Sequence, residues 1–199
     1  MYKKTLYHIL QIFTRPLVCE QKEIQRQILE CLPANGSQKV FVLDFGCGDG
    51  LHRSCTNVSS CVAYVGVDRF KPAVIRARRN FPGSVFLAGD QRLCFRDGSI
   101  DFVILANVLH HMSRAEADTL IRDLCRVMKK TGRISLIEAE QRIKQQGFFF
   151  RLVTSLEMIL HGSHFEAVDV YKDYFSGFFD QLYCRRLSDN FYCLSLIKR

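Results

Sequence analysis

The 199-residue sequence has no apolar run long enough to span a bilayer, no Cys-x-x-Cys pair, no internal repeat and no low-complexity tract. The first absence excludes a membrane-spanning helix, because such a helix needs about 20 consecutive apolar residues. The second argues against zinc, and Cys55 and Cys61 also lack the His and Cys neighbours that a zinc site requires. We therefore expect a protein without a bound metal and with at most peripheral membrane contact.

Nine cysteines are scattered along the chain in no recognisable framework. An odd, irregular set argues against a secreted disulfide protein and favours reduced, mostly buried thiols. The first residues resemble a signal peptide, but His8 and Gln11 interrupt the apolar stretch, and Arg15 and Pro16 follow in place of a cleavage site. These observations predict a cytoplasmic protein.

The formal net charge is +8, which favours an anionic partner such as a nucleic acid or a membrane surface. The basic residues are nevertheless spread along the chain, and the densest group is 76–79, with Arg69 and Lys71 close by. An exposed helix face explains this group as well as a binding patch does. Charge alone therefore leaves the partner open, and nothing in the sequence indicates the oligomeric state.

Short apolar runs alternate with amphipathic stretches from residue 39 to residue 138. This alternation predicts a parallel sheet with right-handed crossovers, hence a doubly wound α/β fold. The expected strands are 40–45, 62–67, 84–87, 100–106 and 133–138, and the expected helices are 51–60, 72–80 and 115–130, with Gly132 ending the last helix. After them we expect a helix around 168–178 and an antiparallel hairpin of strands 181–187 and 191–197.

Two further segments flank this core in what we expect to be a single domain spanning 1–199. Residues 1–34 carry two helical patterns, the first with Leu6, Ile9, Leu10 and Phe13 and the second with Ile24, Ile28 and Leu32. Residues 139–165 form an insertion rich in aromatic side chains. A lid over an apolar acceptor and a pair of core helices covering the sheet are both compatible with this composition.

The strongest motif lies at the carboxyl end of the first expected strand, where Asp44 precedes Gly46, Gly48 and Gly50. Glycines let the backbone turn sharply and let a ligand approach closely, and in open α/β sheets ligands bind at this edge. A dinucleotide fingerprint would read G-x-G-x-x-G, whereas these glycines alternate. A carboxylate here suits the cationic amine of S-adenosylmethionine (SAM), directly or through water.

Further polar residues follow the next strands. Asp68 ends the second strand, where a carboxylate can accept hydrogen bonds from the ribose hydroxyls of an adenosine. Asp90, after the third strand, is placed to accept from an adenine amino group or to serve only as a turn residue. The fourth strand delivers Asn107, His110 and His111 to the same edge.

Matched in order and spacing, these motifs resemble class I SAM-dependent methyltransferases, most of all a small-molecule branch that includes quinone-biosynthesis enzymes. The resemblance covers about residues 40–138 by motif and 165–199 by the helix and hairpin. It implies a mostly parallel, seven-stranded sheet with helices on both faces, an antiparallel last strand, and SAM as cofactor. We expect cofactor contacts in and beside the motifs, from Asp44, Gly46, Cys47, Gly48, Asp68, Arg69, Asp90, Gln91 and Asn107.

The segment after the fourth strand departs from nucleic-acid methyltransferases. Asn107-Val-Leu-His-His stands where enzymes that methylate nucleobase amines have Asn/Asp-Pro-Pro-aromatic, and no Pro-Cys or Thr-Cys nucleophile occurs. Nucleic-acid substrates are therefore disfavoured, although the basic charge keeps an RNA methyltransferase open. The motifs are also compatible with a SAM-binding regulator without catalysis and with an NAD-dependent oxidoreductase, but the glycine spacing argues against the oxidoreductase.

The predicted function is methyl transfer from SAM to a small, apolar or aromatic acceptor by in-line displacement. His111 is the candidate general base, because imidazole titrates near neutral pH and this residue lies just past the fourth strand. The competing interpretation is that His111 only packs beneath the cofactor loop and orders it.

Overall fold

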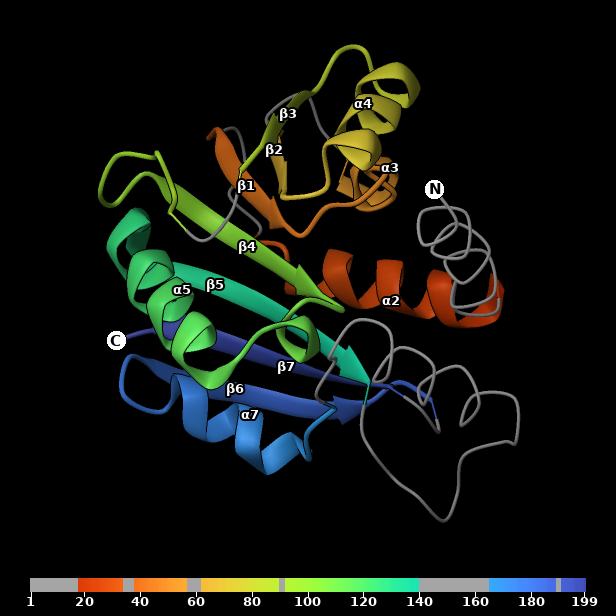
Figure 1. Cartoon of the computed structure of the whole chain (residues 1–199). Helices are drawn as coiled ribbons and strands as arrows, with labels where there is room; N and C mark the ends of the chain where they lie inside the picture. Colours follow the sequence, from red (N-terminus) through yellow and green to blue (C-terminus); the bar gives the residue numbers. More distant parts are fainter. Residues whose placement is uncertain (1–17, 34–37, 57–61, 90–91, 140–164, 189–190) are drawn as a thin grey trace.

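The computed structural model describes residues 18–33, 38–56, 62–89, 92–139, 165–188 and 191–199 (Figure 1). Several predictions fall outside these ranges: the first N-terminal helix, the lid apart from its two end residues, and the cofactor contacts Asp90 and Gln91.

The described strands form one seven-stranded sheet in the order β3-β2-β1-β4-β5-β7-β6 (Figure 1). Their bounds are β1 Val40–Phe45, β2 Val62–Asp68, β3 Val85–Ala88, β4 Ile100–Ala106, β5 Met128–Ala139, β6 Phe179–Arg186 and β7 Phe191–Lys198. Neighbours run parallel except at β7, which is antiparallel to both β5 and β6. The predicted doubly wound α/β sheet and its antiparallel last strand are confirmed.

Helices cover both faces of this sheet (Figure 1). They are α2 Val18–Cys31, α3 His52–Thr56, α4 Lys71–Asn80, the 3-10 turn η1 Leu109–His111, α5 Arg114–Val127 and α7 Val168–Phe175. One apolar core lies between the sheet and α5 with α7, and the other lies on the face of α2 and α4. Every residue of the central strand β4 is buried, as expected for a strand covered on both faces.

The junction of α5 and β5 differs from the prediction. The helix ends at Val127 and the strand begins at Met128, so the expected helix end at Lys130 and strand start at Arg133 are wrong. The reason is a bulge: Ile100 pairs with Met128, but Phe102 already pairs with Arg133. Gly132 lies within this bulge and does not terminate the helix. A Cβ there would lie 2.9 Å from the carbonyl oxygen of Lys129.

Helix boundaries elsewhere follow local capping chemistry. The helix α5 starts with a capping box, in which Ser113 and Glu116 satisfy each other's backbone N–H groups. The helix α3 starts at His52, one residue later than predicted, and the residues beyond Thr56 up to Cys61 are outside the described ranges. No helix among the described residues is both long and apolar enough to cross a membrane.

Candidate cofactor and active site

The glycine loop, residues 46–50, follows β1 and is hydrogen-bonded to the carboxyl end of β2. The N–H groups of Gly46 and Cys47 both donate to the carbonyl of Val67, at 2.8 and 3.1 Å. Gly46 and Gly48 have φ values of 75° and 52°, a region that glycine enters without steric cost. A Cβ on Gly46 would lie 2.4 Å from Cγ2 of Val108, whereas one on Gly48 would meet no heavy atom within 4 Å in the described structure. Packing requires Gly46, and Gly48 leaves its backbone open to a ligand.

Asp68 lies across this loop at the end of β2. Its Oδ2 accepts from the N–H of Gly48 at 2.8 Å, and its Oδ1 accepts from the N–H of Phe70 at 2.7 Å. The side chain is half-buried, and each oxygen retains a second lone pair that a ribose hydroxyl can use. Arg69, the next residue, is exposed.

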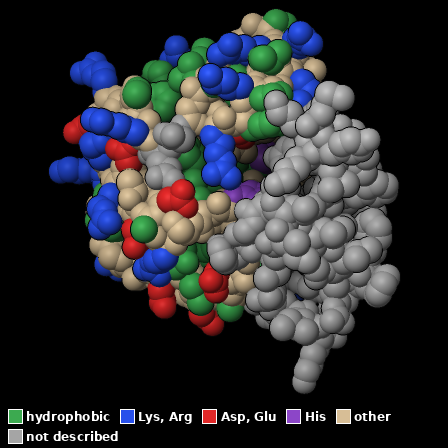
Figure 2. All heavy atoms as spheres, in the orientation of Figure 1, with side chains coloured by type: hydrophobic (Ala, Val, Ile, Leu, Met, Phe, Trp, Pro, Cys, Tyr) green, Lys and Arg blue, Asp and Glu red, His purple; other side chains and the backbone are tan. Residues whose placement is uncertain are grey.

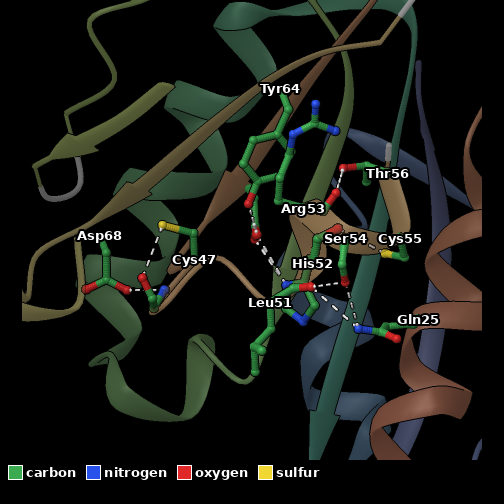
Figure 3. Close-up of polar contacts among 12 residues, drawn as sticks. Gln25, Cys47, Leu51, His52, Arg53, Ser54, Cys55, Thr56, Tyr64 and Asp68 are labelled. Carbon is green, nitrogen blue, oxygen red and sulfur yellow. Dashed lines mark hydrogen bonds and ion pairs between the residues drawn. The ribbon is translucent and has the colours of Figure 1, made fainter. Parts of the chain in front are cut away.

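Asp44 points to the α2 and α3 side of the sheet and is completely buried. The hydroxyl of Tyr64 donates to its Oδ2 at 2.5 Å, and Nδ1 of His52 lies 3.2 Å from the same oxygen (Figure 3). Burial, and then the charge of Asp44, raise the pKa of Tyr64 well above its usual value, so the phenol stays protonated and donates. The carboxylate predicted to meet the cofactor amine is thus enclosed by two side chains.

Cys47 and Asn107, two further predicted cofactor contacts, lie at the ends of β1 and β4. Cys47 is buried, and its Sγ would lie 2.8 Å from a Cβ on Gly66. Burial raises the pKa of this thiol, so it stays neutral, and the side chain packs into the apolar core. Asn107 has a φ of 57° and donates its N–H to the carbonyl of Ile137 at 2.8 Å, at the turn between β4 and η1.

The sequence interpretation missed Glu138, near the carboxyl end of β5. Its Oε1 accepts from the N–H groups of Val108 and Leu109 at 2.8 and 2.7 Å, and its Oε2 lies 2.7 Å from Nδ1 of His110. Glu138 is 0% and His110 4% exposed, so this pair is isolated from water. The available signal was an acidic residue directly after the mostly apolar stretch 134–137, on the strand beside β4.

His110 and His111 stand at the same sheet edge as the glycine loop. Their ring centroids are 4.0 Å apart, and the ring of Phe165 stacks on His110 at 4.6 Å with planes 18° apart. An ionised carboxylate only accepts hydrogen bonds, so Nδ1 of His110 carries a proton and donates it to Glu138. His111 is half-exposed. Figure 2 shows histidine side chains inside a hollow on this face of the molecule.

The donor set fits SAM better than a dinucleotide. A pyrophosphate needs backbone N–H groups at the glycine loop, but the N–H of Gly48 is already donated to Asp68. Asp68 offers acceptors to the ribose hydroxyls of a ligand, and the open side of Gly48 gives that ligand room. Among the described residues, no cluster of three His, Cys, Asp or Glu side chains could hold a metal ion.

Residues 43–136 match the family model of the methyltransferase domain. Over this stretch the chain is similar to class I SAM-dependent methyltransferases, as its motifs indicate. An uncharacterized methyltransferase of the cyanobacterium Synechocystis is 32% identical over 111 residues, which are 55% of this chain and 51% of that protein. The chain thus spans about half the length of the curated relative that it matches.

Solved structures share the fold of this methyltransferase domain at low sequence identity. A SAM-dependent methyltransferase of Methanosarcina mazei superposes with a TM-score of 0.69 at 17% identity, covering 86% of this chain and 96% of that one. An O-methyltransferase family 2 protein of Planctomyces limnophilus, solved with apigenin, gives 0.70 at 16% identity, covering 88% and 56%. SAM is the cofactor of this domain class, whereas the narrower resemblance to quinone-biosynthesis enzymes stays a prediction.

Proposed function

We propose that this protein transfers the methyl group of SAM to a small, apolar or aromatic acceptor by in-line displacement. The observation that carries the proposal is the buried Glu138–His110 pair, which orders η1 at the sheet edge of the glycine loop. Fixing η1 in this way also fixes the place of His111 on the same turn, and an imidazole held in place is suited to proton transfer. SAM supplies an electrophilic methyl group, and the residues of this chain orient the reactants.

We assign proton removal from the acceptor to His111. Of the two histidines, His111 keeps a partly exposed ring, whereas His110 is 4% exposed and covered by Phe165. In this assignment Glu138 and His110 hold η1 and thereby the neighbouring imidazole in place. A base within hydrogen-bond reach of the acceptor contributes about 10²–10⁴-fold to the rate of such a step.

An aromatic or apolar acceptor is supported by the surroundings of the histidines. Phe165 presents a flat ring beside His110, and aromatic faces stack well on planar ligands. The similar Planctomyces limnophilus protein was solved with apigenin, a small aromatic molecule. Many arginines, by contrast, pair with carboxylates of this chain, among them Arg26, Arg114 and Arg126, which reduces the charge open to an RNA.

Two measurements test this function. Calorimetry with SAM and with NAD should show binding of SAM only; tighter binding of NAD would contradict the assignment. Labelled SAM is then incubated with metabolite, lipid and RNA fractions of cells, using the unmodified protein and the variants His111→Gln and His110→Gln.

We expect label in a small-molecule fraction, and at least about a hundredfold loss for His111→Gln with SAM affinity retained. Loss of transfer only in His110→Gln would move the base to His110. Binding of SAM without label in any fraction would favour a regulatory SAM-binding protein, and label in RNA alone would favour an RNA methyltransferase.

A further inference from the structure

His52 stands between the buried Asp44 carboxylate and the solvent. The side chain of Asp44 is 1% exposed and that of His52 is 12% exposed. Within the described structure, the other hydrogen-bond partner of the carboxylate is the hydroxyl of Tyr64, which lies in the core. A ligand at this end of β1 therefore meets the imidazole before it meets the carboxylate.

The partner of Nδ1 decides what His52 offers to a ligand. An ionised carboxylate accepts hydrogen bonds and cannot donate one, so Nδ1 of His52 carries the proton toward Asp44. In the neutral imidazole Nε2 then has a lone pair and accepts. An ionised Asp44 with a neutral His52 carries a net charge of minus one and presents an acceptor nitrogen, a combination that favours a cationic N–H donor.

The local structure holds His52 at this place. On its N-terminal side the N–H of Gly50 donates to the carbonyl of Cys47 at 2.9 Å, which closes the turn before α3. Beside the helix, Gln25 from α2 donates to the carbonyl of Leu51 at 3.4 Å (Figure 3), and Arg53 on the helix donates to Ser84 at 2.6 Å. Contacts from separate elements thus fix α3, and a group held in this way binds with little loss of entropy.

We propose that Nε2 of His52 accepts a hydrogen bond from the α-ammonium group of SAM, with Asp44 acting through the imidazole. This inference rests on the proposed function, because it assumes that SAM occupies the site. It replaces the contact, direct or through water, that was predicted for Asp44, and it adds a residue that the sequence motifs did not indicate. Asp44 becomes a positioning residue, which fixes the tautomer of His52 and supplies the negative charge.

The test compares S-adenosylhomocysteine with an analogue that lacks only the α-amino group, each titrated by calorimetry into the full chain. The central variant is His52→Asn, because an asparagine amide can take the place of Nδ1 and donate to Asp44 but does not extend to the position of Nε2. His52→Gln is the rescue variant, since its longer side chain brings an amide oxygen to about that position. Ser54→Ala on the same helix is the control.

We expect the unmodified protein to bind S-adenosylhomocysteine at least about tenfold more tightly than the analogue, the difference that one charged hydrogen bond makes. His52→Asn should remove this preference by weakening S-adenosylhomocysteine alone, His52→Gln should restore part of it, and Ser54→Ala should retain it. An equal loss for both ligands in His52→Asn would mean that His52 only supports the loop, and an unchanged preference would exclude it from the site. Either result overturns the inference while the proposed function stands, whereas failure of the unmodified protein to bind either ligand overturns the proposed function itself.

Discussion

Glu138 of β5 and His110 of η1 meet at 2.7 Å between Oε2 and Nδ1. The remaining oxygen of Glu138 takes the N–H groups of two residues of the same turn. One buried carboxylate therefore satisfies three donors of the segment that follows β4. Since this segment also holds His111, the geometry of the candidate base depends on a residue of another strand.

Replacing Glu138 should destabilise the protein in a graded way. Glu138→Ala leaves three buried donors without their acceptor, at about 1–3 kcal/mol each, so the free energy of unfolding should fall by at least about 3 kcal/mol. Glu138→Gln keeps an oxygen for the two backbone N–H groups and should lose about half as much. Urea unfolding measures both, with Glu116→Gln in the exposed capping box as a control expected to change stability by less than about 1 kcal/mol. Equal stability of the alanine and glutamine variants would contradict this account.

The two glycines of the loop should respond differently to alanine. In Gly46→Ala the new Cβ collides with Val108, so we expect a clear drop in melting temperature. Gly48→Ala meets no described atom, so its cost is the positive φ, about 1–2 kcal/mol. The same Cβ enters the space left for the ligand, and SAM affinity should fall by at least about tenfold. Thermal melts and calorimetry on the two variants check the pair. Unchanged SAM affinity in a folded Gly48→Ala protein would place the cofactor elsewhere.

Asp68→Asn should weaken SAM by about tenfold or more while the protein stays folded. The asparagine can accept through one oxygen only, so it cannot serve Gly48, Phe70 and the ribose together. A charged hydrogen bond contributes about 1.5–3 kcal/mol, which is one to two decades of affinity. The matched control is Asp49→Asn in the same loop, whose carboxylate faces Arg76 at 3.5 Å. Equal losses in the two variants would point to a loop effect and remove Asp68 from the ribose site.

Tyr64→Phe removes the hydroxyl group that donates to the buried carboxylate of Asp44. Because the pKa of Tyr64 is raised and the hydroxyl stays protonated, this bond exists throughout the range in which the protein is stable. Losing a hydrogen bond to a buried charge should cost about 1.5–3 kcal/mol in the free energy of unfolding. SAM affinity should change by less than about threefold, since His52 retains its own contact with Asp44. A large loss of affinity at constant stability would show that Tyr64 itself contacts the ligand.

Much of the sheet was predictable because its strands differ clearly in pattern from its helices. The apolar run 100–106 and the alternation around it correctly predicted a strand covered on both faces. The boundary of α5 and β5 was not predictable in this way, because apolar periodicity continues through Met128 while a bulge decides where the strand pairs. A bulge is a property of two strands, and one strand's pattern does not contain it.

Within the site, residue types were easier to predict than their orientations. Asp44 and Asp68 were identified from their positions at strand ends, but only the structure shows that Asp44 is enclosed by Tyr64 and His52. The contact between Glu138 and His110 spans 28 residues of sequence and depends on the register of β4 against β5. Such a contact leaves no local pattern in the chain.

The position of β7 has a consequence for synthesis of the protein. Residues 191–198 are paired on both sides, with β5 and with β6, although they follow both strands in the chain. Until those residues leave the ribosome, β5 is an open edge with unpaired N–H and C=O groups, and open edges recruit other chains. The nascent protein thus carries a vulnerable strand, the one that bears Glu138, until the last residues of the sheet are made. We expect a requirement for chaperones at this stage to be relieved only when β7 pairs with β5.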